Sequence, residues 1–388
     1  MKENTTKKYA LNYIYLSRKH AGGKDQVALN LLQGWYETGV TKDCVVFCYE
    51  YSVDIIRSIA PDVEIEVIDS HRKKKESELL RLLRIVRDNT FVIPELLEKY
   101  KATVIFHASC TNGLRKFKVS SVVIPHDIKA VSHRILGEVK ISLYKYILYR
   151  IMYSIDFKHA DRIVAISKSD LREMSRYYPQ YREKLVHIYN PIKVSLEEQK
   201  DNSELEKHGN NIVAINLQFH HKNIITLIKA FEKIKDKIDS DLVLIGAVPK
   251  RVHYLIDYVE GNQLSDRVKF TGFVNAREKR AHLMDCALYV NPSLFEGFGM
   301  TAVEAMILGV PTLLAKVSTN EEVTMGMCNY YEPADDVDAL AAAILKCLNR
   351  TYEEQDLLTK SKKMQEAYDY RVIAGQYMNL FHQVGDNA

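Results

Sequence analysis

The sequence predicts an α/β protein with two doubly wound parallel sheets, each in a domain of its own. Short apolar runs alternate with longer amphipathic stretches along the 388 residues. The runs are apolar almost throughout, which is typical of parallel strands covered on both faces. The alternation occurs in two sets, separated by a polar, charged stretch at 191–210. At about 150 residues per domain, the length also favours two domains.

The first half of the chain supplies the elements of the first domain, with apolar runs as strands and amphipathic segments between them as helices. The predicted strands are 9–16, 43–49, 63–69, 102–108, 120–127 and 161–167, and the predicted helices include 26–39 and 76–89.

The second half repeats the pattern. The predicted strands are 211–218, 241–248, 266–274, 286–293 and 310–316, and the predicted helices include 226–238, 277–286 and 300–308. A last helical stretch, about 354–384, is longer than one more α/β unit needs. We therefore predict an N-terminal domain at 1–192, a C-terminal domain at 193–366, and a final helix at 367–388 that packs back on the N-terminal domain.

Composition excludes several classes of protein. Apolar residues make up 47% of the chain, which is too many for a disordered protein. No run of about 18 apolar residues predicts a membrane span, and the N-terminus lacks the apolar core of a secretory signal. The six cysteines form no C-x-x-C pair, which favours reduced, buried thiols in a cytoplasmic protein.

Charge is distributed unevenly along the chain. Residues 1–195 hold 33 Lys and Arg against 22 Asp and Glu, whereas the remainder has an excess of acidic residues. This asymmetry indicates that the first half faces something anionic, such as nucleic acid, a membrane surface or a phosphorylated substrate.

The segment 289–316 carries the clearest functional signal. It passes from a strand through a glycine-containing loop into a helix, which Gly309 and Pro311 end. The first amides of a helix suit phosphate, and glycines let an anion approach that backbone. Glu296 and Glu304 cannot bind phosphate themselves, so their natural partners are the hydroxyls of a ribose or a sugar. The alternative is a plain turn whose Glu304 only caps or is solvated.

The pattern N-P-S-x-x-E-G-F-G-x-x-x-x-E-A-M-x-x-G-x-P at 291–311 resembles the signature of glycosyltransferase family 4, whose two glutamates match Glu296 and Glu304. The resemblance implies a B-type glycosyltransferase fold, with two Rossmann-like domains facing across a cleft. It also implies that the first domain binds the acceptor and the second the nucleotide sugar. Other donor-binding residues implied by it are Gly297, Phe298, Gly299, Met300 and Thr301.

Two further segments fit the same resemblance. Gly22 and Gly23, after the first strand, resemble the family's glycine loop at the donor phosphates, although a lone Gly-Gly is also common in plain turns. Phe273 and Val274 end a segment similar to the one that lies against the nucleotide base.

The segment 214–223 departs from the family pattern. Lys222 matches a lysine that binds the diphosphate, but Leu217 stands where the family often has an arginine. Asn216, Gln218 or a neighbouring histidine could replace part of that arginine's hydrogen bonding, but not its charge. A lysine near a helix start is mildly unfavourable, so a phosphate partner would explain Lys222.

His126 follows the strand 120–127 at the carboxyl edge, where open α/β sheets bind ligands. The family has a histidine here that faces the transferred sugar, and the alternative is an ordinary loop histidine. With Glu296 and Lys222, His126 completes the predicted catalytic set.

Basic and aromatic residues gather at 71–76 and 140–158. Tyrosine mixed with lysine and arginine on an apolar helix suits the surface of an anionic membrane. The alternative is a core helix with a solvated basic face. No nucleic-acid-binding pattern is visible.

The sequence thus predicts a retaining glycosyltransferase that moves a hexose-type sugar from a nucleotide-diphosphate sugar to a glycan or lipid-linked acceptor, in polysaccharide biosynthesis. We expect it in the cytoplasm or on the cytoplasmic face of the membrane, with neither metal nor other cofactor. Two alternatives remain: a sugar-nucleotide epimerase of the same fold, and a non-catalytic sugar-nucleotide-binding protein.

Overall fold

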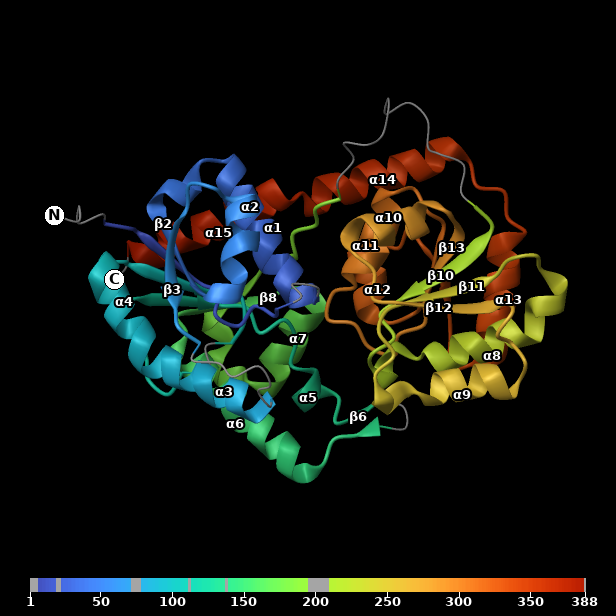
Figure 1. Cartoon of the computed structure of the whole chain (residues 1–388), viewed down its shortest axis with the longest axis horizontal. Helices are drawn as coiled ribbons and strands as arrows, with labels where there is room; N and C mark the ends of the chain where they lie inside the picture. The colour runs from blue at the N-terminus through green and yellow to red at the C-terminus, as the bar shows by residue number, and fades with distance from the viewer. Residues whose placement is uncertain are drawn as a thin grey trace. The chain divides into compact units, whose positions relative to one another are not determined.

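The computed structural model describes residues 6–18, 22–70, 78–110, 113–136, 139–194 and 209–386 (Figure 1). These residues divide into two compact units. Unit 1 contains the described residues up to Arg134, those from Ile141 to Lys193, and those from Tyr368 onward; unit 2 contains those from Val194 to Ala367, together with the short stretch at 135–140.

Unit 1 is built on a seven-stranded sheet in the order β3-β2-β1-β4-β5-β8-β9, in which every neighbouring pair is parallel. Its strands are β1 (Tyr9–Asn12), β2 (Cys44–Tyr49), β3 (Glu64–Ile68), β4 (Val104–His107), β5 (Ser120–Val123), β8 (Arg162–Ala165) and β9 (Leu185–His187). Its helices are α1 (Gly23–Glu37), α2 (Val53–Ile59), α3 (Glu78–Arg87), α4 (Ile93–Tyr100), α5 (Lys129–Ser132), α6 (Leu143–His159), α7 (Lys168–Tyr177) and α15 (Tyr370–Gly385).

Helix α15 is part of unit 1 although it lies at the far end of the sequence. Its Phe381 ring packs 5.7 Å from that of the fully buried Trp35 on α1, and the Trp35 indole N–H donates to the Ala374 carbonyl at 3.0 Å. A Cβ at Gly34 would lie 2.7 Å from the Tyr370 carbonyl oxygen, so only glycine permits this close approach of the two helices.

Unit 2 is built on a six-stranded sheet in the order β12-β11-β10-β13-β14-β15, again parallel throughout. Its strands are β10 (Asn211–Ile215), β11 (Leu242–Ile245), β12 (Val268–Gly272), β13 (Cys286–Asn291), β14 (Thr312–Ala315) and β15 (Asn329–Tyr331). Its helices are α8 (Ile224–Ile234), α9 (Tyr254–Gly261), α10 (Ala276–Met284), α11 (Met300–Ile307), α12 (Ser318–Val323), α13 (Val337–Leu348) and α14 (Glu354–Tyr368), which extends one residue beyond the unit. A short antiparallel pair, β6 (Ile135–Leu136) and β7 (Val139–Lys140), completes the described strands.

Each sheet has one point at which the strand order reverses. It lies between β1 and β4 in unit 1 and between β10 and β13 in unit 2. Open parallel sheets bind ligands outside the carboxyl ends of their strands at such a point, because the connections diverge there and leave a crevice. The two doubly wound sheets confirm the predicted fold class.

Several elements differ from the sequence prediction in extent. The first strand ends at Asn12 rather than at 16, and the stretch at 354–384 forms two helices, α14 and α15. The break falls at Asp369, whose carboxylate accepts hydrogen bonds from the Arg371 and Val372 amides and caps α15.

Candidate active site

The predicted catalytic residues of unit 2 meet where the loops after β10 and β13 touch. The Leu294 amide donates to the His221 carbonyl at 2.8 Å, which joins the two loops. Lys222 Nζ then lies 2.7 Å from Glu296 Oε1, with only 13% and 9% of the two side chains exposed. The structure therefore brings together, at the reversal point of the sheet, two residues that lie far apart in sequence.

Glu296 is held as a carboxylate by several donors. Asn291, at the end of β13, donates to Glu296 Oε1 at 3.0 Å, and its own oxygen accepts from the Ser293 amide and hydroxyl. Burial alone would raise the pKa of Glu296, but the Lys222 charge and the hydrogen bonds from Lys222, Asn291 and Ser293 outweigh it, so this pKa lies below its usual value.

The loop between Glu296 and α11 presents backbone to the same place. Gly299 has φ +89°, a left-handed conformation that other residues rarely adopt, and no side chain caps the helix that follows. The amides at the start of α11 are therefore open to an anion. Phe298 is buried in the core, so it can offer only its backbone. The fully buried Asn320, which sequence reasoning missed, has an oxygen near Gly299 that accepts no hydrogen bond from the described residues.

Glu304 lies one turn inside α11 and has a partner that the sequence did not predict. Lys279 Nζ of α10 is 2.7 Å from Glu304 Oε2, and both side chains are mostly buried. The buried Tyr289 lies close enough to both Glu296 and Glu304 for their charges, after burial itself, to raise its pKa. Glu296 and Glu304 therefore both lie near Tyr289, and each is paired with its own lysine.

The loop after β10 explains the departure at Leu217. Leu217 is 1% exposed and packs in the main core of unit 2, whereas Asn216 adopts φ +76° just before it. A Cβ at Gly246 would lie 3.3 Å from the Leu217 amide nitrogen, so the backbones are also close here. A charged side chain at 217 would have either to leave this core position or to be buried at high cost.

The end of β12 lies beside the end of β11, because the Gly246 amide, directly after β11, donates to the Gly272 carbonyl at 2.9 Å. Phe273 follows, with 52% of its surface exposed, and Val274 is partly buried against the core. An exposed aromatic ring at the carboxyl edge suits stacking on a flat base.

In unit 1, His126 has a fixed protonation state. It adopts φ +70°, is 5% exposed, and its Nε2 lies 2.7 Å from the Ala108 carbonyl oxygen. Burial and the charge of Lys24 lower the pKa of His126 to about 3 against the opposing effect of that carbonyl. The ring is therefore neutral at pH 7, and Nε2 carries its proton because a carbonyl only accepts. Nδ1 is left as an acceptor.

Gly22 and Gly23 begin α1 and are exposed, and Lys24 next to them is the cation whose charge reaches His126. These residues follow β1, one of the two strands at the reversal point of the first sheet. Sequence reasoning missed Lys24, although it directly follows the two predicted glycines.

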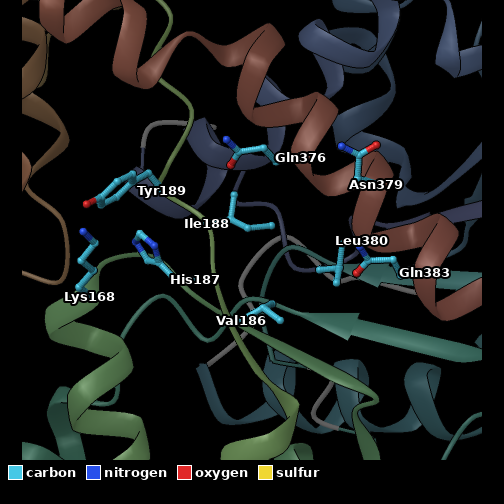
Figure 2. A pocket seen from close by; sticks show the side chains of 9 residues that line it. All are labelled: Lys168, Val186, His187, Ile188, Tyr189, Gln376, Asn379, Leu380 and Gln383. Carbon is cyan, nitrogen blue, oxygen red and sulfur yellow. The ribbon is translucent and has the colours of Figure 1, made fainter.

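A cavity of about 540 Å³ in unit 1 lies apart from the predicted residues. Figure 2 shows it between α15, which carries Gln376, Asn379 and Gln383, and the segment around His187 and Tyr189. None of the residues that line it belongs to the predicted set.

Across the described part of the chain, no group of three or more His, Cys, Asp or Glu side chains is arranged to hold a metal ion. No helix in that part is both long and apolar enough to cross a membrane. All six cysteines are free thiols.

Comparison with known proteins places this arrangement in a family. The sequence model of the family glycosyl transferases group 1 matches residues 196–365, and that of glycosyltransferase family 4 matches residues 21–196. A glycosyltransferase of Methanocaldococcus jannaschii, itself uncharacterized, is 25% identical over 57% of this chain and 59% of its own length. The O-antigen chain mannosyltransferase RfbU of Salmonella typhimurium is 26% identical over 49% of this chain and 52% of its own length. The chain thus spans little more than half of these relatives.

Solved structures share the fold over nearly the whole chain. Sucrose-phosphate synthase from Thermosynechococcus elongatus has a TM-score of 0.76 at 17% identity, with 98% of this chain and 100% of that chain covered. HepE from Anabaena, solved in complex with UDP and glucose, has a TM-score of 0.70 at 17% identity, with 97% and 99% covered. The chain therefore belongs to the group 1, family 4 glycosyltransferases and has their B-type fold.

Proposed function

We propose that the protein is a retaining glycosyltransferase that moves a hexose-type sugar from a nucleotide-diphosphate sugar to a glycan or lipid-linked acceptor, in polysaccharide biosynthesis. The observation that carries the proposal is the buried pair of Lys222 and Glu296 beside the uncapped start of α11. The cation and the open amides suit a phosphate, and the carboxylate suits a sugar hydroxyl.

The donor would lie along the carboxyl edge of the second sheet. Lys222 and the amides from Gly297 to Thr301 stabilise the diphosphate as its negative charge develops, which is commonly the largest catalytic effect. Glu296 binds hydroxyls of the sugar, and Glu304 those of the ribose. Phe273 and Val274 lie against the base, with Asn216 and Gln218 near the phosphates.

As the family resemblance implies, the acceptor hydroxyl would attack from the face that the diphosphate leaves, without a covalent intermediate, and the leaving phosphate would take up the proton of that hydroxyl. The resemblance also implies that no metal takes part. The acceptor belongs to unit 1 in this proposal. Neutral His126 of the same unit would accept a hydrogen bond through Nδ1 from a hydroxyl of the transferred sugar. Gly22 and Gly23 give the donor phosphates close access to backbone. RfbU and WbdA are named as mannosyltransferases and HepE was solved with UDP-glucose, which supports a hexose donor.

A panel of nucleotide sugars tests the proposal against its two alternatives. Slow release of nucleoside diphosphate into water indicates a transferase. An epimeric sugar nucleotide would indicate an epimerase of the same fold, and binding without turnover would indicate a non-catalytic binding protein. The presence of Glu296, Glu304 and Lys222 argues against the non-catalytic alternative.

Replacing Glu304 by glutamine should weaken nucleoside diphosphate binding roughly tenfold, because a charge-assisted hydrogen bond to the ribose is lost. Lys279→Met is the matched variant, since it breaks the 2.7 Å ion pair but leaves the carboxylate in place, and its effect should be smaller. Calorimetric titration with UDP and GDP measures both. Unchanged affinity in Glu304→Gln would show that this carboxylate does not hold the ribose.

The proposal also includes peripheral membrane contact, for which helix α6 supplies the surface. Leu143, Tyr144, Ile147 and Ile151 are exposed at helical spacing on one face, and Lys145 and Arg150 are exposed on the same helix. Apolar and aromatic groups mixed with cations suit an anionic lipid surface, where each cation contributes about 1 kcal/mol, screened by salt. The basic run at 71–76 lies outside the described residues.

Co-sedimentation with lipid vesicles tests this contact. We expect binding to anionic vesicles and not to neutral ones, weakened by high salt. The double variant Ile147→Glu with Ile151→Glu should lose binding, whereas Val372→Glu, an equally exposed apolar position on α15, should retain it. Failure of the wild-type protein to sediment with anionic vesicles would remove the membrane contact from the proposal and leave the donor site untouched.

A further inference from the structure

The carboxyl edge of the second sheet has as many paired carboxylates as paired lysines. Lys222 pairs with Glu296 and Lys279 with Glu304, each at 2.7 Å and each largely buried. Together these two ion pairs carry no net charge. A diphosphate carries more than one negative charge at neutral pH, and the amides of α11 compensate it only partly. A further cation at this edge would compensate the remaining charge of a diphosphate.

Arg251 is placed to supply that charge. It lies in the short helical turn Lys250–Val252 after β11, the strand next to β10 in the sheet. Its Nε donates to the Gln218 carbonyl at 2.8 Å, and its guanidinium lies 4.9 Å from the centre of the Phe219 ring. Both contacts are in the loop that ends with Lys222. Arg251 is thus anchored to the start of this loop, while Lys222 stands at its end.

The anchoring leaves the terminal nitrogens of Arg251 uncommitted. Its side chain is exposed, and no carboxylate of the described residues forms an ion pair with it. The planar guanidinium fork matches two phosphate oxygens better than an ammonium does. The carbonyl and the ring already restrict the side chain, so less conformational entropy is lost when an anion binds.

We propose that Arg251 binds the diphosphate of the nucleotide-sugar donor and shares its charge with Lys222. This inference rests on the proposed function and names a binding residue that the motif at 291–311 does not contain. It also relates to Leu217, which is buried and carries no charge. Arg251, in the loop after the neighbouring strand β11, would supply the positive charge that position 217 lacks.

Two neighbouring lysines are less suited to bind the diphosphate, because one is already paired and the other is not held in place. Lys316 is 2.9 Å from Glu332 and is therefore already paired. Lys250, directly before Arg251, is exposed, and its ammonium makes no hydrogen bond to the described residues. Lys250 is thus equal in charge and adjacent in sequence but unanchored, which makes it the matched control.

The test compares nucleoside diphosphate with nucleoside monophosphate, using the full-length protein with UDP and UMP and with GDP and GMP. We expect Arg251→Gln to weaken binding of the preferred diphosphate on the order of tenfold, as for loss of one charge-assisted contact. Monophosphate affinity should change much less, because base and ribose contacts persist. Lys250→Gln should leave both affinities close to those of the wild type, and Arg251→Lys should recover only part of the loss.

The outcomes separate this inference from the function on which it rests. If the wild type prefers the diphosphate and Arg251→Gln keeps the same preference, Arg251 does not bind the phosphates, although the proposed function stands. If Arg251→Gln loses affinity equally for diphosphate and monophosphate, Arg251 serves the structure of the loop instead. The unfolding temperature of the variant would then also fall. A wild-type protein that binds none of these four nucleotides and no nucleoside diphosphate of the other bases in the donor panel overturns the proposed function and this inference with it.

Discussion

Replacing Glu296 by glutamine should abolish sugar transfer almost completely while nucleoside diphosphate binding stays nearly intact. Glutamine keeps the shape of the side chain and an oxygen that accepts from Lys222 and Asn291. It loses the negative charge that the proposed sugar contact needs, and nucleotide alone does not use that contact. Since Lys222 is also released from its counter-charge, diphosphate affinity should be unchanged or slightly higher.

Transfer rate and diphosphate affinity must be measured on the same preparation of Glu296→Gln, with thermal unfolding as the control for the fold. Glu304→Gln gives the opposite pattern in this assignment, since its ribose contact exists in the nucleotide itself. Equal losses of affinity in both variants, or the reverse order, would show that the two carboxylates have been assigned to the wrong groups.

Removal of the Lys222 side chain by substitution with alanine should slow transfer on the order of 10²–10³-fold, the typical effect of losing one preorganised contact to a developing anion. The structure adds a complication, because the variant leaves Glu296 buried without its counter-charge. Breaking a buried ion pair from one side costs about 3–5 kcal/mol of stability.

The double variant Lys222→Ala with Glu296→Gln separates the two effects. It contains no uncompensated charge, so its thermal unfolding should return toward that of the wild type, while transfer stays lost. Steady-state transfer at saturating donor and a melting curve are the two measurements. A Lys222→Ala protein that transfers sugar at the wild-type rate would refute the phosphate assignment.

The fold was accessible from the sequence because it depends on local pattern. A strand buried on both faces is apolar throughout, as Val45 and Val46 in β2 and Leu313 and Leu314 in β14 are. The loop that carries Glu296 was accessible for a different reason, since a sharp strand-to-helix turn needs Gly299 at a positive φ. Both requirements can be recognised from a few consecutive residues of the sequence.

Contacts between distant segments left no such pattern. Lys279 and Glu304 pair across α10 and α11, and nothing in either helix identifies the other. The burial of Leu217 depends on how the loop after β10 packs against the core, which composition does not reveal. Arg251 reaches Gln218 only because β11 lies beside β10 in the sheet. All three features depend on how distant segments pack together in the folded unit.

The anomeric configuration of the first sugar released is the most direct measurement of the central claim, that a nucleotide-diphosphate donor reacts at Lys222 and Glu296 with retention. An α-linked nucleotide sugar that supports turnover is incubated with the wild type and with Glu296→Gln, and early time points are followed by proton NMR before the free sugar mutarotates. We predict the α-anomer together with nucleoside diphosphate for the wild type, and neither product for the variant. Release of the β-anomer, or of a sugar phosphate with nucleoside monophosphate, would contradict the claim.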